Sequence, residues 1–408
     1  MRKRIALFAV VAVALAAFLG GPSAVCAQQS VKLGAGDTLT ISGFINATMF
    51  NNRGLFDFGQ GQNAEWASLV QPTTDQGFLD GDIRNTRIRF DFASGPVLGK
   101  WAPKATLEAD FFGANNGIPP FGDEQPQLRA RFAYVDLTDG RTTLRVGQFW
   151  APLFGEVPVS LTHLAFPLGY GATGMIGWRF PGVFLYHDLR PGKPLTIQVQ
   201  LALLKGSGPV VGIGGVGSGE ASGKPQFEAR FNLAKKFGSA SWNGYVVYHV
   251  DNKDVNGVGV AGGDLNGWGF ETGHNVTSGK LTVHGNYYFG HNLGQQFGHI
   301  TQGAGSNAAP ANQQGRIQGW GAWAQAGYDF TTHWGVWFYY GMDQPDASKF
   351  LQQNGVALLR QLSHDTDALV RFRAGRYALG LEYFRAVTRW STGVRTADQY
   401  ALSVLYTL

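Results

Sequence analysis

Cysteine and metal-ligand motifs are almost absent from the sequence. Its 408 residues include one cysteine, Cys26, and nine histidines that form no HxH or HExxH motif and no cluster with carboxylates. Disulfides, thiolate nucleophiles and zinc sites need paired or clustered ligands of these types. We therefore expect no disulfide, no metal site and no cofactor.

Long hydrophobic runs are also missing, apart from one at the N-terminus. Arg2 to Arg4 carry three positive charges, an apolar run covers 5–19, and Val25-Cys26-Ala27 is a small-residue cleavage motif. This order predicts a secretory signal peptide over 1–27, whose removal takes away Cys26 and leaves 28–408 as the mature chain. An uncleaved membrane anchor is the alternative, although the run is short for a span.

The charge excess is small once this leader is set aside. The whole chain has a formal net charge of +5, and the leader contributes three of these charges, which leaves +2. A charge of this size gives no reason to expect a nucleic-acid partner. The glycine-rich stretch 206–224 has GxG spacing without a preceding βαβ pattern, so it is predicted to be a loop and not a nucleotide site. No linker divides 28–408, which we treat as one domain.

Strand-period patterns, by contrast, recur along the whole of the remaining chain. Alternating apolar and polar residues mark sixteen predicted strands, most of them long enough to cross a bilayer at a tilt. They lie over 38–50, 83–94, 104–113, 127–138, 142–150, 174–187, 195–205, 225–236, 240–250, 265–276, 280–290, 317–330, 334–342, 367–374, 376–387 and 398–408.

The predicted connections alternate between short and long. Short ones include 138–141, 190–193, 235–239, 277–280, 331–334 and 374–377, and long ones include 51–82, 114–126, 151–173, 206–224, 291–316 and 343–366. Short turns at one end and long loops at the other are typical of outer-membrane β-barrels. A chain that begins and ends at the short-turn end needs an even number of strands, and sixteen satisfies this.

The two faces of the predicted strands differ in polarity. In 195–203 every second residue is Leu, Ile or Val, whereas the residues between them are mostly polar. The same alternation assigns Leu128, Ala130, Phe132 and Tyr134 to a lipid-facing side and Arg129 and Arg131 to an inner side. Aromatic residues near predicted strand ends suit an interfacial girdle; they are Phe50, Phe111, Tyr134, Trp150, Tyr328, Trp334, Tyr340 and Tyr406. We predict an all-β fold, a closed antiparallel up-and-down transmembrane β-barrel of about 16 strands with an aqueous lumen.

Arginines gather on the polar faces of particular predicted strands. The candidate pore-lining residues are Arg87, Arg89, Glu108, Asp110, Arg129, Arg131, Arg145, Arg179, Arg371 and Arg373, and Arg230 and Arg385 fall on the polar faces of further strands. Those on predicted strands 2 to 6 would form one basic wall, with Glu108 and Asp110 pairing with the guanidinium groups. Such a wall attracts anions and excludes cations. The alternative is an Arg–carboxylate network that only stiffens the wall.

The predicted loop 151–173 is apolar for a connection between strands. It contains Pro152, Leu153, Phe154, Val157, Leu161, Leu164, Phe166 and Tyr170. Because large exposed apolar patches are rare on proteins, we expect this third long loop to fold into the barrel and narrow it. Glu156 and His163 are then the candidate constriction residues. The alternative is a loop that docks on a neighbouring subunit.

Several of these segments resemble a known family. The stretches ISGFINATMF, RNTRIRFDF, ATLEADFFG, LRARFAYVDL and LRVGQFWAPLF are similar to Gram-negative outer-membrane porins of the DcaP-like trimeric group. The resemblance implies a sixteen-stranded homotrimer that passes small anionic solutes, dicarboxylates among them. It also implies selectivity roles for Arg87, Arg89, Arg129, Arg131, Arg145 and Arg179. The heptad extension of some members does not fit into Gln28–Asp37, and Leu408 stands where porins usually end in an aromatic residue.

The sequence thus predicts a non-enzymatic protein of the Gram-negative outer membrane, a water-filled passive diffusion channel for small hydrophilic, preferentially anionic solutes. Its expected partners are those solutes, outer-membrane lipid and lipopolysaccharide, and further copies of the chain in a homotrimer. A phosphate- or sugar-selective porin is one alternative. A barrel enzyme such as a phospholipase is another, although no Ser–His–Asp/Asn set falls on the outer wall at lipid level. A barrel plugged by its loops, with a structural or adhesin role, is the third.

Overall fold

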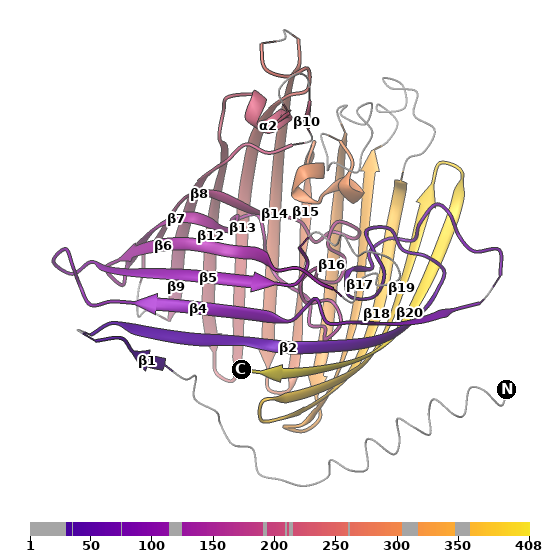
Figure 1. Cartoon of the computed structure of the whole chain (residues 1–408), viewed down its shortest axis with the longest axis horizontal. Helices are drawn as coiled ribbons and strands as arrows, with labels where there is room; N and C mark the ends of the chain where they lie inside the picture. Colours follow the sequence, from indigo (N-terminus) through magenta and orange to yellow (C-terminus); the bar gives the residue numbers. More distant parts are fainter. Residues whose placement is uncertain are drawn as a thin grey trace.

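The closure of a single antiparallel sheet defines the architecture. The computed structural model describes residues 30–408 except 35, 75, 114–124, 191–193, 209, 212–214, 260–261, 304–316 and 347–359, so the predicted signal peptide lies outside it. The sheet closes because its first long strand, β2 (Thr38–Arg53), pairs with its last strand, β20 (Gly393–Thr407). Figure 1 shows these two strands side by side at the lower edge of the barrel.

Sixteen strands form the barrel, and each pairs with its neighbours in chain order. The second is split into β3 (Phe78–Asp82) and β4 (Arg87–Ala93), which pair with successive parts of β2. The next thirteen are β5 (Ala102–Asp110), β6 (Arg129–Thr138), β7 (Thr142–Trp150), β8 (Arg179–Asp188), β9 (Leu195–Leu204), β12 (Gln226–Phe237), β13 (Ala240–Asp254), β14 (Asp264–Ser278), β15 (Leu281–His291), β16 (Gln318–Asp329), β17 (Trp334–Asp346), β18 (Arg360–Ala374) and β19 (Tyr377–Trp390).

The remaining elements are short. β1 (Ser30–Lys32) pairs with the start of β2, and β10 (Val210–Val211), β11 (Val216–Gly217) and α2 (Ser218–Ala221) lie between β9 and β12. The described parts of the loops contain three 3₁₀ turns, η1 (Gly61–Asn63), η2 (Gly294–Gln296) and η3 (His299–Thr301). Within the described ranges, no helix has the length and apolar character needed to cross a membrane.

The predicted strands and the sorting of their connections are confirmed, with shifted ends. The turns after β4, β6, β8, β12, β14, β16 and β18 are all shorter than the connections after β2, β5, β7, β9, β15 and β17. One connection on the loop end departs from the pattern, because β19 and β20 are joined by residues 391–392 alone. β18 begins at Arg360, inside the segment 343–366 that was predicted as a loop, and its outer half carries polar residues on both faces.

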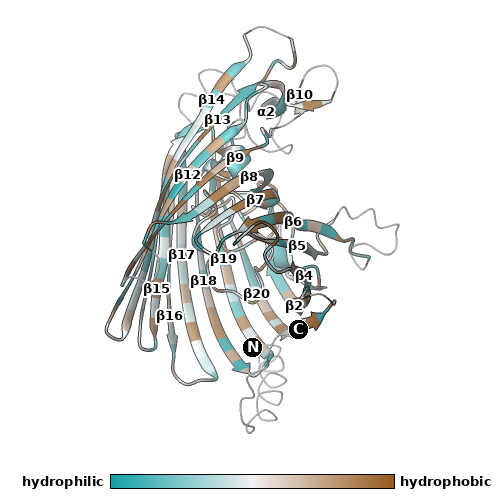
Figure 2. Ribbon diagram, turned by 90° about the vertical axis from the view of Figure 1, so that its left-hand side faces the viewer, coloured by the Kyte–Doolittle hydropathy of each residue, from teal (hydrophilic) through white to brown (hydrophobic). Residues whose placement is uncertain are grey.

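The barrel wall is lower on one side than on the other. β5 to β9 have 9 or 10 residues each, whereas β13, β14, β18 and β20 have 15. In Figure 1 the shorter strands, in purple and magenta, cross in front of the longer ones. Figure 2 shows the longer strands extending well beyond the shorter group.

Exposure alternates along the strands as the sequence predicts. In β9, Leu201 and Leu203 are exposed on the outer face, while Ala202 and Leu204 are buried on the inner face. Teal and brown segments alternate along β17 to β20 in Figure 2 for the same reason. The alternation follows from the two-residue period of a strand, which sends neighbouring side chains to opposite sides of the sheet.

A β-bulge in β6 overturns part of this prediction. Glu108 of β5 pairs with Phe132, but Ala109 pairs with Ala130, so one extra residue is inserted in β6 at this point. The side chains after the bulge therefore change sides. Phe132 and Tyr134, predicted to face lipid, are only 5% and 7% exposed and pack inside against Phe149.

The predicted aromatic girdle is partly wrong for a related reason. Tyr328, Tyr340 and Tyr406 are exposed on the outer face, as predicted. Phe50, however, is buried on the inner face of β2, and Trp150 turns toward the interior to stack on Phe154. Alternation alone cannot distinguish these cases, because the polarity of an aromatic ring fits either side of a barrel wall.

Apolar residues of the connection 151–178 form much of the interior core. Phe166 and Tyr170 belong to one buried cluster with Trp323 of β16, Tyr339 of β17 and Phe384 of β19. These three partners occupy the buried positions of their strands, between exposed neighbours. The connection therefore packs against the inner face of the tall wall.

Candidate functional site

Arginines from β6 converge on one carboxylate of β5. Asp110 accepts hydrogen bonds from Arg129 at 2.7 and 3.0 Å and from Nη1 of Arg131 at 2.8 Å. The register makes this contact local, since Asp110 pairs directly with Arg129 across the two strands. Paired N–H donors on a carboxylate give a strong and oriented ion pair.

Glu108 joins the arginines of both neighbouring strands. Its Oε1 accepts a 2.8 Å hydrogen bond from Nε of Arg131, and the same oxygen lies 3.6 Å from Nε of Arg87. Its Oε2 lies 3.7 Å from Nη1 of Arg89, which also pairs with Asp91 at 2.8 Å. The predicted arrangement, in which the β5 carboxylates bridge the arginines of the second and fourth barrel strands, is thus present.

Three arginines of this network are more exposed than the two carboxylates of β5 between them, whereas Arg131 is buried like those carboxylates. The side chains of Arg87, Arg89 and Arg129 are 20%, 32% and 21% exposed, whereas those of Glu108 and Asp110 are 4% and 0% exposed. These three guanidinium groups are therefore the more accessible part of the network.

Arg145 continues the basic surface on β7. It makes two hydrogen bonds to Asp136, at 2.7 and 2.8 Å, in a fork-to-fork geometry. Its guanidinium also lies 3.7 Å from the ring centroid of Tyr134 and 4.0 Å from that of Phe149. The bulge in β6 makes this site, because it turns the ring of Tyr134 inward.

Arg179, at the start of β8, differs from the other arginines. Its side chain is buried between the rings of Trp150 and Trp178, at 4.7 and 4.4 Å from their centroids. Among the residues that the structure describes, no carboxylate lies within ion-pair distance of it, and its Nη1 has no hydrogen-bond partner. Its positive charge is therefore stabilised by cation–π contacts with these two rings and not by a counter-ion.

The other predicted arginines lie away from this group. Arg371 and Arg373 contact Asp329 at 3.2 and 3.3 Å, near the short turns of β16 and β18. Arg385 was assigned to a polar inner face, but it is on the outer face of β19, where it pairs with Asp398 at 3.1 Å. The outer ends of β19 and β20 carry polar residues on both faces, so polarity there does not indicate the lumen.

Arg230 has a role that the sequence did not suggest. Its Nη1 donates to the backbone carbonyls of Pro152 and Phe154, at 2.9 and 3.0 Å, and its guanidinium lies 3.7 Å from the ring of Tyr245. Leu153 is fixed from the other side, because its N–H donates to Glu228 at 2.7 Å. The start of the connection 151–178 is thus held against β12 and β13.

Glu156 is bound to the wall and not free in the lumen. Its Oε2 accepts a hydrogen bond from Asn275 at 3.0 Å and lies 3.1 Å from Nδ1 of His284. Burial alone would raise the pKa of this carboxyl, but the contacts with His284 and Asn275 outweigh it and lower the pKa. With Arg230 and Tyr245 it lines an interior cavity of about 460 Å³.

His163 was predicted to be a constriction residue, but the structure places its side chain between the connection and the inner face of β19. Its ring lies 5.0 Å from that of Phe384, and its backbone N–H donates to the hydroxyl of Ser160 at 2.7 Å. Complete burial lowers the pKa of His163 to about 3, so the ring is neutral at physiological pH. It therefore presents no charge to the open interior.

The middle of the connection 151–178 is fixed to strands on both sides of the β2–β20 pair that closes the barrel. The N–H groups of Leu161 and Thr162 donate to Glu382 of β19 at 3.2 and 3.0 Å. Asn46 of β2 donates to the carbonyl of Leu161 at 3.2 Å, and Asn85 donates to that of Thr162 at 2.6 Å. These contacts come from strands at opposite ends of the sequence.

Buried carboxylates on the tall wall were missed by the sequence analysis. Asp343, Asp365, Asp367 and Glu382 occupy buried inner positions of β17 to β19. Burial and the neighbouring Asp365 raise the pKa of Glu65, which reaches them from the connection between β2 and β3. The sequence signal for them was the spacing of acidic residues at every second position in the stretches SHDTDAL and GLEYF. Part of the first stretch lay in the predicted loop 343–366, so this spacing was not recognised as a strand.

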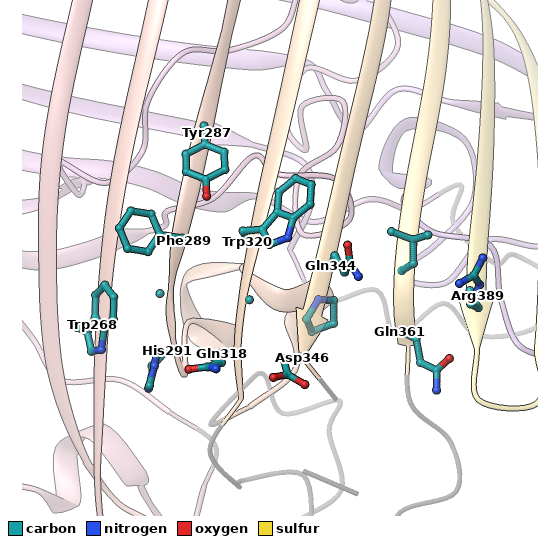
Figure 3. A pocket seen from close by; sticks show the side chains of 14 residues that line it. Trp268, Tyr287, Phe289, His291, Gln318, Trp320, Gln344, Asp346, Gln361 and Arg389 are labelled. Atoms are coloured by element: carbon teal, nitrogen blue, oxygen red, sulfur yellow. The ribbon is translucent and has the colours of Figure 1, made fainter. Parts of the chain in front are cut away.

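A second cavity lies on the outer side of the barrel. It has a volume of about 590 Å³ and is lined by residues of β14 to β19, among them Trp268, Tyr287, Phe289 and Trp320. Figure 3 shows these rings with polar groups such as Gln318, Asp346 and Arg389 along the same strands. The groove is separate from the arginines, which lie on the opposite, lower wall.

Comparisons with known proteins address the fold. No family model and no curated protein matches the sequence. The chain aligns with the outer membrane channel DcaP of Acinetobacter baumannii at 16% identity and a TM-score of 0.69, covering 93% of this chain and 99% of that one. An anion-selective porin from Comamonas acidovorans aligns at 11% identity with a TM-score of 0.57, covering 91% of this chain and 100% of that one. The trimer form of Vibrio cholerae OmpT aligns at 12% identity with a TM-score of 0.51, again covering 91% of this chain and 100% of that one.

These alignments confirm the predicted resemblance at the level of architecture. The identities are low, but the aligned structures are covered almost from end to end. The chain therefore has the closed sixteen-stranded β-barrel fold of outer-membrane porins.

Proposed function

We propose that this protein is an outer-membrane porin that provides a passive channel for small hydrophilic solutes and prefers anions. The observation that carries the preference is the difference in exposure between the arginines of β4 and β6 and the carboxylates of β5. Arg89 is 32% exposed, whereas Glu108 beside it is 4% exposed. A solute in the channel therefore approaches these guanidinium groups before it approaches the two carboxylates of β5, whereas Asp91, which pairs with Arg89, is as exposed as its partner.

The charge balance of this wall supports the same preference. Six guanidinium groups, those of Arg87, Arg89, Arg129, Arg131, Arg145 and Arg179, stand with the four carboxylates of Asp91, Glu108, Asp110 and Asp136. Six minus four leaves a net charge of +2. In a water-filled channel with low-dielectric walls such an excess raises the local anion concentration. Planar guanidinium forks also suit carboxylates and phosphates, which makes dicarboxylates reasonable solutes.

The connection 151–178 supports a narrowed channel. Its contacts reach β12, β15, β16 and β19, and its buried aromatic residues fill space beside the tall wall. The remaining passage is then bounded by the arginine wall on the opposite side. Export through a cleaved leader and assembly into a homotrimer complete the proposal; one protein of the same fold is described as a trimer and another as anion-selective.

The test is the reversal potential of the purified protein in a planar bilayer under a KCl gradient. We expect a potential that favours chloride for the unaltered protein. Replacing two of the three exposed arginines, Arg89→Gln with Arg129→Gln, reduces the net charge from +2 to zero and should abolish the preference. The matched control is Arg385→Gln, which removes one positive charge from an equally ion-paired arginine on the outer face.

Each result has a distinct meaning. A cation-selective reversal in the unaltered protein, or a chloride preference that survives the double substitution, would leave the arginines as wall-stiffening groups. A protein that inserts but passes no current would be a barrel plugged by its own connections. Current that is blocked by phosphate or by a sugar at low concentration would favour a solute-specific porin.

A further inference from the structure

The interior cavity beside Glu156 is a region of the lumen distinct from the arginine wall. It has a volume of about 460 Å³ and lies against the inner faces of β9, β12 and β13, near the short turns that end these strands. The described residues that line it include none of the six wall arginines. Its size falls within the range of small-molecule sites, roughly 300–1,000 Å³.

Arg230 is the fixed cation of this cavity. Its Nε donates to Asn232 at 2.8 Å, its Nη1 donates to the backbone carbonyls of Pro152 and Phe154, and its guanidinium lies on the ring of Tyr245. All of these partners are neutral, and nowhere in the described chain does a carboxylate come within ion-pair distance of Arg230. Its Nη2 donates no hydrogen bond to a described residue and is not buried. One donor group of a rigidly held guanidinium is therefore left for an anionic group.

Two carboxylates line the same cavity, those of Glu156 and Asp188. Glu156 uses its Oε2 for the contacts with Asn275 and His284, so that Oε1 accepts no hydrogen bond from the residues the structure describes. Burial would raise the pKa of this carboxyl, but these two contacts and the nearby charge of Arg230 lower it. Glu156 is therefore ionised at neutral pH and keeps one oxygen for a cationic group.

Tyr245 fixes the spacing between the opposite charges. The guanidinium of Arg230 lies 3.7 Å from the centroid of its ring, and its hydroxyl accepts the backbone N–H of Glu156 at 3.2 Å. The side chain of Tyr245 is itself buried. One rigid ring thus holds both the cation and the residue that carries the anion, so little ordering is left for a ligand to induce.

The charge balance of the cavity differs from that of the arginine wall. Its described lining residues include two cations, Arg190 and Arg230, and two anions, Glu156 and Asp188. Two minus two leaves a net charge of zero, whereas the wall carries +2. The amide side chains of Gln198, Asn232 and Asn243 add neutral donors and acceptors. A cavity of this kind complements a molecule that carries one group of each sign, and not a simple anion or cation.

We propose that this cavity binds small zwitterionic solutes of the amino acid type, with the carboxylate at Arg230 and the ammonium at Glu156. The proposal rests on the proposed function, because the solute reaches the cavity through the channel, and it adds a solute class to that function. The two contacts are charge-assisted hydrogen bonds, which are about twice as strong as neutral ones. Because the cavity lies toward the short turns, it would hold a solute that has already passed the connection 151–178.

The experiment measures binding directly, by saturation-transfer NMR on the purified protein in detergent, with protein-free detergent as the background. The probes are 4-aminobutyrate, butyrate and butylammonium, which share a four-carbon chain and differ in their charged groups. We expect 4-aminobutyrate to bind about tenfold more tightly than either analogue, because each analogue lacks one charge-assisted contact.

Substitutions assign the two ends of the probe. Glu156→Gln keeps acceptor capacity for Asn275 and should weaken 4-aminobutyrate binding about tenfold without weakening that of butyrate. Arg230→Gln should weaken the binding of both. Glu220→Gln is the matched control, because Glu220 lies in the segment between β9 and β12, pairs with Lys205 and does not line the cavity.

Three results would overturn the proposal. They are equal affinity for 4-aminobutyrate and butyrate, which would indicate a plain anion site, no binding of any probe, and unchanged 4-aminobutyrate binding in the Glu156 variant. Arg230 also holds the connection, so if Arg230→Gln fails to fold, Glu156→Gln decides alone. Binding in detergent needs no current. A protein that binds 4-aminobutyrate but gives a cation-selective reversal potential would contradict the proposed anion preference and leave this site intact.

Discussion

The guanidinium of Arg145 stacks on the ring of Tyr134, 3.7 Å from its centroid. Strict alternation along β6 would place that ring on the outside, and only the extra residue of the bulge, Arg131, turns it inward. The stacked pair is thus a direct product of the bulge. Asp136, two residues further along β6, reaches the same arginine because the bulge has moved it to the same side.

Tyr134→Leu should weaken the barrel because it removes the ring face on which Arg145 lies. We expect a loss of about 1–2 kcal/mol in the free energy of unfolding, between the values for exposed and for fully desolvated cation–π contacts. The measurement is urea unfolding in detergent, followed by the shift of the folded band on a gel. Tyr340→Leu, on the outer face of β17, is the control and should change the unfolding midpoint little in detergent.

Glu108→Gln should have opposite effects on stability and on selectivity. It removes the counter-ion of buried Arg131, and breaking a buried ion pair from one side costs about 3–5 kcal/mol. It also raises the net charge of the arginine wall from +2 to +3, so the reversal potential should move further toward that of chloride. Asp398→Asn, which breaks the outer pair with Arg385, should leave the reversal potential unchanged. A shift of the Glu108 variant toward potassium would contradict the assignment of this wall to the channel.

Glu382→Ala should release the middle of the connection 151–178. The carboxylate accepts the N–H groups of both Leu161 and Thr162, and alanine has no acceptor to replace it. We expect greater current noise and brief changes of conductance in single-channel recordings. Glu382→Gln keeps one acceptor oxygen and should leave the single-channel recordings nearly unchanged. Identical traces for the alanine variant and the unaltered protein would show that the connection does not bound the channel.

Acid should destabilise the protein through His163. Its pKa is about 3 in the folded state, below the unfolded value near 6.5, so the unfolded chain takes up a proton that the folded one does not. The stabilising contribution is complete above pH 6.5 and falls by about 1.4 kcal/mol per pH unit from there toward pH 3. His163→Asn should therefore show a smaller loss of unfolding free energy between pH 7 and pH 4.5. The variant will keep some pH dependence, because burial also lowers the pKa of His299 to about 3.

The sequence predicts the barrel well because the two-residue period is repeated in every strand. It also locates the carboxylates of β5 between the arginines of β4 and β6, since neighbouring strands in an up-and-down barrel are neighbours in the chain. What it misses depends on single insertions or on contacts remote in sequence. The bulge at Arg131 leaves no mark in the alternation on either side of it. The neutral, buried state of His163 follows from contacts with β19, more than 200 residues away.

The connection 151–178 also spans the seam where the barrel closes. Asn46 of β2 donates both to Leu161 and to Val404 of β20, and the hydroxyl of Thr162 contacts that of Ser403 at 2.9 Å. These partners come together only when the last strand has reached the first. During biogenesis the middle of the connection therefore completes its contacts only when β20 is in place, so seam closure and the last step of docking coincide. A barrel arrested before β20 would leave the side chain of Asn46 without Val404 and the hydroxyl of Thr162 without Ser403, which gives chaperones and proteases a chemical mark of an unfinished molecule.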